Sequence, residues 1–175
     1  IGVGVLALVQ HLQKKATENL FHPFAGEFQA ICEQCFAQVD QFPTLFGSQF
    51  DDYHPYAPYV QGKVLIVEAL TGEAIGSSMI ALPDEIAATN REDVGTLVCA
   101  GEIDQFQFST YSDDQPGYIQ VRNFCVYDLP MEAVIFAAEI QGSRPPPTKN
   151  TGGPEAGTDP AYSPLIDILE DLPRR

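Results

Sequence analysis

Four blocks of apolar residues between residues 60 and 142 are typical of β-strands. Lys63–Glu68 is a short apolar run that favours a buried strand, whereas 94–111 and 118–127 alternate apolar and polar positions and 133–140 forms a fourth run. Short connections between strands favour antiparallel pairing, because a parallel pair needs a long crossover. The pattern therefore predicts an antiparallel β-meander of about four to five strands.

Segments with helical periodicity precede and follow this β-rich region. Apolar residues at spacings of three and four predict a helix over 24–42, which Pro43 ends. A helical turn is expected over Leu82–Ala88. Ser163–Leu172 predicts a short amphipathic helix, which we expect to dock on its own sheet rather than in a groove of another protein, because so short a helix is barely stable alone. The predicted fold class is α+β, with an N-terminal helical region and a short C-terminal helix.

Residues 1–20 form an apolar N-terminal segment that is a candidate for the end of a membrane anchor. Nine apolar residues rise only about 14 Å as a helix, too little to cross about 30 Å of hydrocarbon. Lys14 and Lys15 behind the run favour a membrane-associated protein on the cytoplasmic face. The end of a signal segment and a buried helix of a soluble protein remain alternatives. The candidate membrane or partner contacts are Val3, Val5, Leu6, Leu8 and Val9.

The rest of the chain divides into 21–59, a helix followed by an aromatic, Pro-rich strap; 60–142, the β-rich domain; and 143–175, a Pro/Gly-rich linker with the C-terminal helix. The strap is the preferred interface candidate, because Phe and Tyr are favoured at protein interfaces. The alternative is a strap that packs on its own sheet. The candidate interface residues are Phe42, Phe46, Phe50, Tyr53, Tyr56 and Tyr59.

Net charge narrows the possible partners. The chain has 24 acidic and 9 basic side chains, a formal charge of −15. Phosphate backbones and anionic lipid headgroups would be repelled, which disfavours nucleic acid and charge-driven membrane adsorption. Other protein subunits are the favoured partners.

The cysteines are Cys32, Cys35, Cys99 and Cys125, too few and too unevenly spaced for a disulfide scaffold. Cys32 and Cys35 fall in mid-helix on the apolar face, whereas a redox pair normally opens a helix. A zinc site would need a second close pair, which the chain lacks. We predict buried structural thiols, with a redox or zinc module using Cys32 and Cys35 as an alternative.

No catalytic motif stands out. Asp51, Asp52 and His54 offer ligands and a proton shuttle, but three such residues arise easily by chance in a polar stretch, and a solvated turn is the favoured explanation. No phosphate-binding loop, nucleophile elbow or zinc-protease motif occurs. We therefore predict no catalytic residue, cofactor or metal and expect a protein that is not an enzyme. The alternative is a soluble enzyme or small-ligand-binding domain with dispersed site residues near His54.

Several stretches resemble small uncharacterised bacterial proteins: Tyr59–Val67, Leu82–Ala88, Glu92–Val98, Tyr111–Gly117 and Cys125–Leu129, with an ending like Leu172–Arg174. The resemblance covers about residues 59–175 and implies an N-terminal hydrophobic helix with a compact β-rich domain behind it, and no activity. The expected function is a non-enzymatic accessory or assembly-stabilising subunit of a larger membrane-bound complex, acting through protein–protein contacts.

Overall fold

The computed structural model describes residues 2–41, 58–148 and 153–175. The strands β1 to β4 and the helices α2 and α4 lie close to the bounds that the sequence predicts, whereas α3 and β5 were not predicted. In chain order they are α1 (Gly2–Phe21), the 3-10 turn η1 (His22–Phe24), α2 (Ala25–Gln41), β1 (Lys63–Glu68), α3 (Gly76–Ala81), β2 (Val94–Thr110), β3 (Pro116–Asp128), β4 (Ala133–Gln141), β5 (Glu155–Ala156) and α4 (Ser163–Asp171).

The sheet is mixed, which corrects the predicted antiparallel meander. Its order is β1-β2-β3-β4, with β5 added to β3. The β2/β3 and β3/β4 pairs are antiparallel, but β1 runs parallel to β2. The connection over residues 69–93 is long enough for a crossover and contains α3. The helical turn expected within Leu82–Ala88 is present, because the Pro83 carbonyl accepts hydrogen bonds from the Ile86 and Ala87 amides, both at 2.9 Å. Helix α3 precedes this turn and was not predicted.

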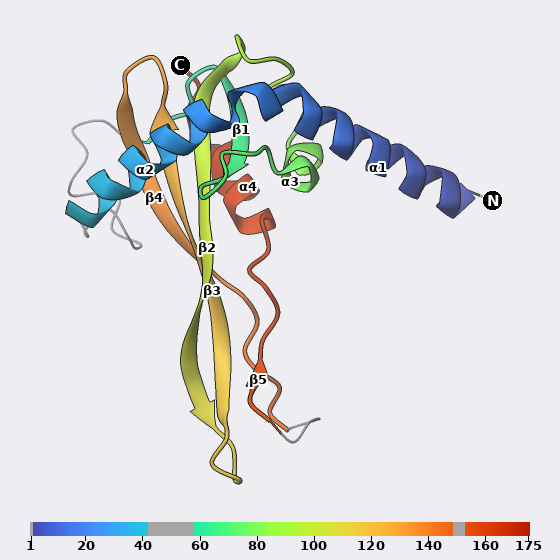
Figure 1. Ribbon diagram of the computed structural model, residues 1–175, viewed down its shortest axis with the longest axis vertical. Coiled ribbons are helices and arrows are strands. Elements are labelled where there is room, and N and C mark those ends of the chain that lie inside the picture. Colours follow the sequence, from blue (N-terminus) through green and yellow to red (C-terminus); the bar gives the residue numbers. More distant parts are fainter. Residues whose placement is uncertain (1, 42–57, 149–152) are drawn as a thin grey trace.

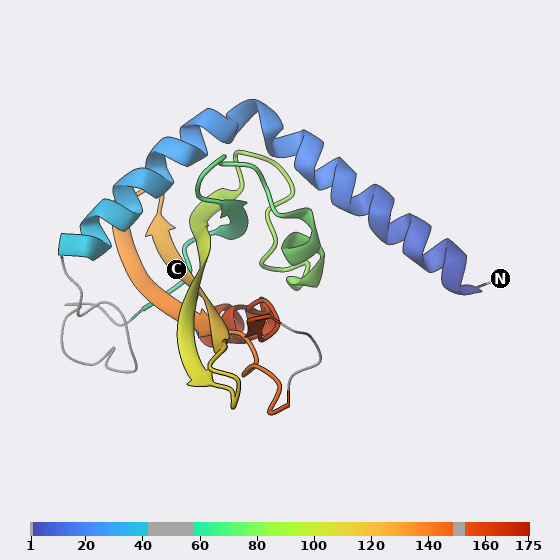
Figure 2. The same ribbon diagram turned by 60° about the horizontal axis from the view of Figure 1, so that its bottom comes forward.

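The two helices α2 and α4 pack on opposite faces of the sheet (Figure 2). Successive strand residues point to opposite faces. Cys125 is bonded to α2, whereas its neighbour Phe124 meets the ring of Tyr162, just before α4, at 5.6 Å. On α4, Leu165 and Leu169 are fully buried in the common core, which confirms that the C-terminal helix docks on its own sheet.

Helix α1 points away from the body of the domain (Figure 1). It touches the body near its C-terminal end, where α3 packs against it: a Cβ added to Gly76 would lie 2.7 Å from the carbonyl oxygen of Lys14. Among the described residues, no helix combines the length and apolarity that crossing a membrane requires.

Candidate interaction site on the hairpin arm

Strands β2 and β3 extend beyond the rest of the sheet as a long hairpin (Figure 1). We call its protruding part, residues 102–122, the arm. In β2, every residue from Val94 to Ala100 is buried, whereas most residues from Glu102 to Thr110 are exposed. The hairpin therefore belongs to the hydrophobic core at one end and to the protein surface at the other.

A β-bulge marks the root of the arm. Ala100 pairs with Phe124 and Ile103 pairs with Arg122, so two residues of β2 lie opposite the single residue Asn123. Bulges bend a strand and increase its twist. Gly101 in the bulge allows a close approach, because a Cβ there would lie 3.1 Å from the Asn123 carbonyl oxygen. The bulge thus lets the arm leave the body at the point where β1 ends.

The two long edges of the arm differ. The β3 edge is covered: β4 pairs as far as Val121, the Gly142 amide donates to the Gln120 carbonyl at 2.8 Å, and β5 pairs with Gly117 and Tyr118. The β2 edge is open, since no strand of the described chain pairs with its outer side beyond Ala100. Unpaired amide and carbonyl groups there can receive another strand.

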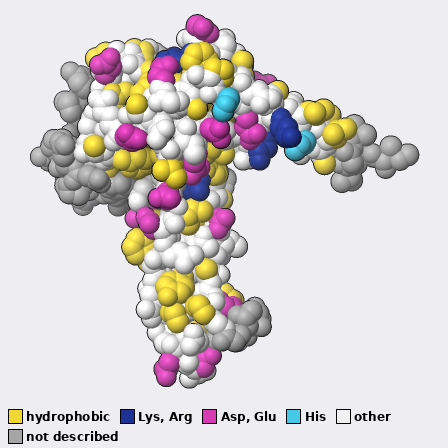
Figure 3. Space-filling view, viewed as in Figure 1, with side chains coloured by type: hydrophobic (Ala, Val, Ile, Leu, Met, Phe, Trp, Pro, Cys, Tyr) yellow, Lys and Arg dark blue, Asp and Glu magenta, His cyan; other side chains and the backbone are white. Residues whose placement is uncertain are grey.

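Exposed aromatic side chains lie along this open strand. Phe106 and Phe108 are 54% and 49% exposed, large fractions for Phe, and the arginine Arg144 lies 5.1 Å from the Phe108 ring centre. The segment Gln105–Thr110 has no charge, Pro or Gly, residue types that oppose strand pairing. A second irregularity of the β2/β3 register falls at Phe108, between Gln107 and Ser109. Figure 3 shows hydrophobic side chains gathered on the lower part of the arm and acidic ones at its tip and near its root.

A surface pocket of about 360 Å³ lies at the root of the arm, between α2, the end of β1 and the bulge. We call it the acidic pocket. Its wall includes the apolar Phe36 and Leu70, and its charged lining residues are Glu33, Glu102 and Asp104. The pocket therefore combines an apolar surface with a negative rim.

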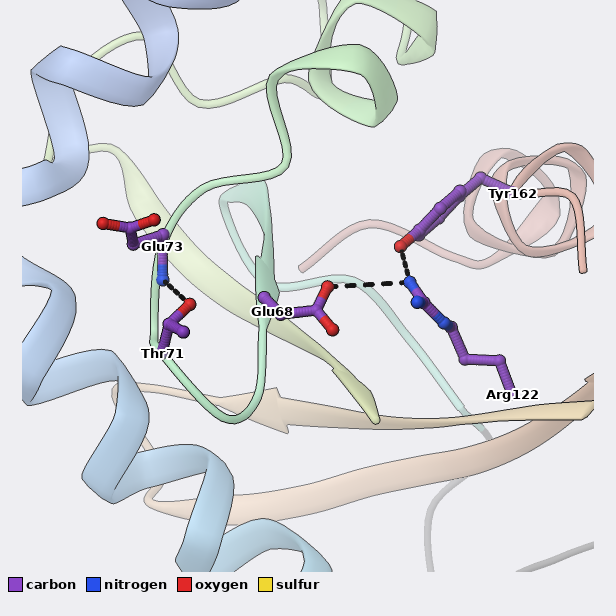
Figure 4. A network of polar contacts seen from close by, with 5 residues as sticks. All are labelled: Glu68, Thr71, Glu73, Arg122 and Tyr162. Atoms are coloured by element: carbon purple, nitrogen blue, oxygen red, sulfur yellow. Dashed lines mark hydrogen bonds and ion pairs between the residues drawn. The ribbon is translucent and has the colours of Figure 1, made fainter. Parts of the chain in front are cut away.

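A polar network fixes the arm root to the C-terminal region (Figure 4). Arg122 donates a hydrogen bond from Nη1 to the Tyr162 hydroxyl and lies 3.6 Å from the Glu68 Oε2. Burial raises the pKa of Glu68; Arg122 opposes this shift and Glu102 adds to it. Burial also raises the pKa of Tyr162, against the opposing effect of Arg122. Arg122 thus links β1, β3 and the segment before α4, and we assign this network a structural role.

Stability should fall in alkaline solution because three tyrosines, Tyr59, Tyr127 and Tyr162, have a pKa raised above the ordinary 10.0, in each case chiefly through burial. Above that pH the unfolded chain loses protons that the folded protein keeps, so the folded state binds more protons and its stability declines as pH rises. Urea unfolding between about pH 9 and pH 11 measures the decline. Tyr162→Phe should make it shallower; equal slopes in the two proteins would contradict this.

The four cysteines are buried as predicted, but they are not thiols. Cys32 is bonded to Cys99 and Cys35 to Cys125, with Cα–Cα distances of 5.4 and 6.1 Å. The correction has a simple cause: Cys99 and Cys125 are far apart in sequence but directly paired between β2 and β3. Cys32 and Cys35 lie one turn apart on α2 above them. Because both sulfurs are bonded to different strands, the structure does not support a redox or zinc module using this pair.

Exposed apolar residues also occur on the N-terminal half of α1. The predicted contacts Leu6, Leu8 and Val9 are 61%, 58% and 44% exposed, while the side chains of Val3 and Val5 lie outside the described part. At about 100° per residue, Leu6 and Leu8 point about 200° apart, so the helix is apolar on more than one side. An all-round apolar surface is typical of a helix surrounded by lipid or protein.

The other predicted site residues fall mostly outside the described ranges. Phe42, Phe46, Phe50, Tyr53 and Tyr56 do so, as do Asp51, Asp52 and His54. The described member, Tyr59, donates a hydrogen bond to the buried Asp128 at 2.6 Å and stacks under Arg175, so it serves packing. Within the described ranges, no three His, Cys, Asp or Glu side chains are arranged to hold a metal.

Sequence reasoning identified Phe106 and Phe108 as strand residues but missed their exposure. A signal was available, because both positions alternate with Gln and the predicted strand is longer than the runs it pairs with. No local feature of the sequence indicated that Glu102 and Asp104 would line a pocket.

Comparisons with protein-family models, curated proteins and solved structures found no match for this chain.

Proposed function

We propose that this protein is a non-enzymatic accessory subunit of a larger membrane-bound assembly, which binds a partner protein through the arm. The observation that carries this proposal is the open edge of β2 with Phe106 and Phe108 exposed along it. Added strands bind through main-chain hydrogen bonds and gain specificity from side-chain contacts. The partner therefore contributes an extended segment, and the strongly acidic chain favours a basic one.

The N-terminal half of α1 supplies the second contact of this proposal. Its apolar side chains Leu6, Leu8 and Val9 are exposed on a helix that projects from the body. Such a helix is suited to a membrane or to helices of a membrane-bound partner. The arm and this helix extend in different directions from the body of the domain, so both surfaces can be engaged at once.

We place the folded domain in an oxidising compartment, on the side of the membrane away from the cytoplasm. Buried disulfides form and persist in secreted, periplasmic or surface locations and are rare in cytosolic proteins. The cytoplasmic placement rested on Lys14 and Lys15 alone, a weak orientation signal beside two disulfides. Maleimide labelling of denatured protein taken from the native host should modify the cysteines only after reduction; labelling before reduction would contradict this placement.

A photo-crosslinking amino acid in place of Gln105 should capture a partner in membranes of the native host. Gln105 is exposed on the open strand, next to Phe106. The full chain should give an adduct of discrete mass, and Phe106→Ser with Phe108→Ser should reduce its yield at least about tenfold, because both anchors are lost. Immunoblotting of the adduct measures the yield.

The same crosslinker in place of Glu92, an exposed loop residue before β2, is the matched control and should give no such adduct. The double Ser variant should keep its urea midpoint, since both rings are already about half exposed. Equal adducts from both positions, an adduct unaffected by the Ser variant, or one made only of two copies of this chain would contradict the proposal.

A further inference from the structure

We infer that the segment received by the β2 edge carries an arginine or lysine, and that this side chain enters the acidic pocket. The inference rests on the proposed function and adds the partner's chemistry and register. The pocket and the edge share β2: Glu102 and Asp104 line the pocket, and the open segment begins at the same residues. A strand added beside β2 therefore starts or ends over the pocket.

The position of β1 shows where an added strand would lie. β1 pairs with β2 until Glu68 lies opposite Ala100, and the chain then turns away at Ala69 and Leu70. A strand that paired with β2 along the arm would continue the line of β1, and one end of it would meet Ala69 and Leu70. Side chains of that strand near its junction with β1 would project into the space beside α2, where Glu33 and Phe36 form the far wall.

The charges at this junction select a cation. Every charged side chain lining the pocket is a carboxylate: Glu33, Glu102 and Asp104, all exposed. The nearby Arg122 does not neutralise them, because it is largely buried and engaged with Glu68 and Tyr162. A guanidinium or ammonium group would form charge-assisted hydrogen bonds with these carboxylates.

The lining also suits the remainder of a basic side chain. Lysine and arginine carry an apolar stem below the charged head, and Phe36 and Leu70 offer the stem an apolar surface. The side-chain oxygen of Asn123, at the same pocket, is buried and accepts no hydrogen bond from the described residues.

At the other end of the edge, Arg144 lies over the Phe108 ring, which disfavours a second cation there. The basic residue is therefore placed at the root of the arm, and an apolar residue of the guest faces Phe106.

Three peptides test this inference. Each is an otherwise identical, end-blocked, strand-forming peptide of alternating Thr and Val, with a pair of Arg, Gln or Glu at one end. Fluorescence anisotropy with the purified full chain measures the three dissociation constants. The Arg peptide should bind about tenfold or more tightly than the Gln peptide, and the Glu peptide most weakly. Raising the salt concentration should shrink the Arg advantage, because exposed charge pairs are screened.

Two variants separate this inference from the proposed function. Glu33→Gln with Glu102→Gln and Asp104→Asn should remove the Arg preference and leave the Gln peptide unaffected. Phe106→Ser with Phe108→Ser should weaken all three peptides by the same factor. Equal binding of the three peptides, lost in the Ser variant, would overturn the cation inference but keep the edge as a binding site. Binding of none of them, or an Arg preference that survives the triple variant, would overturn the inference as well.

Discussion

Replacing Cys32 and Cys99 together by alanine should lower the free energy of unfolding by about 3 to 4 kcal/mol. The two cysteines are separated by 67 residues, but the second disulfide, Cys35–Cys125, remains and shortens the path between them to roughly 30 residues in the unfolded chain. Releasing a loop of that length raises the entropy of the unfolded state. Urea unfolding of the full chain, followed by circular dichroism, measures the loss.

The matched variant is Cys35→Ala with Cys125→Ala, which opens the same effective loop from the other side and should lose a similar amount. Removal of both pairs should cost more than either alone, because the longer loops of 67 and 90 residues are then free. A loss below about 1 kcal/mol in both single-pair variants would show that the disulfides do not stabilise the α2–sheet packing.

Gly72→Ala should destabilise the protein by about 2 to 4 kcal/mol. Gly72 is buried in the turn after β1, with φ of +69°, a left-handed conformation that costs other residues about 1 kcal/mol or more. A Cβ there would lie 1.8 Å from the Ala25 carbonyl oxygen and 2.6 Å from the Gln29 nitrogen, both backbone atoms of α2. The turn or the helix must move to accept it, and the same urea measurement reports the cost.

Gly26→Ala is the control, since it adds the same methyl group one residue from the position that Gly72 contacts. Gly26 is exposed on α2 and a Cβ there meets nothing within 4 Å. Alanine should leave the stability unchanged or raise it by up to about 1 kcal/mol, because glycine is a poor helix residue. If both variants were equally stable, close packing of the β1 turn on α2 would be contradicted.

The strand and helix positions were largely predictable, because they follow from local periodicity. Residues 63–68, 94–111, 118–127 and 133–140 agree closely with β1 to β4, and the C-terminal helix lies where its apolar spacing places it. The direction of β1 was not predictable in the same way. Nothing in Lys63–Glu68 records whether its neighbour runs parallel, and the choice is made by the crossover with α3, whose six residues have too little periodicity to be recognised.

The candidate site was predicted less well than the fold, and the residues show why. The exposure of Phe106 and Phe108 depends on where β1 and the body of the sheet end, which is a property of pairing, not of β2 itself. The acidic pocket joins Glu33 of α2 to Glu102 and Asp104 of β2, about 70 residues apart in sequence. The preferred sequence candidates, Phe42 to Tyr56, lie outside the described residues and remain predictions.

By itself, the sequence determined the acidic charge, the positions of the strands and main helices, and the apolar N-terminal run, because each is a composition or a pattern within a short window. Only the tertiary structure decided the rest. The register between β2 and β3 brings Cys99 beside Cys125, so that α2 bonds to both strands, and the end of β1 leaves the arm with an open edge. Such features depend on contacts between distant segments, which no local pattern records.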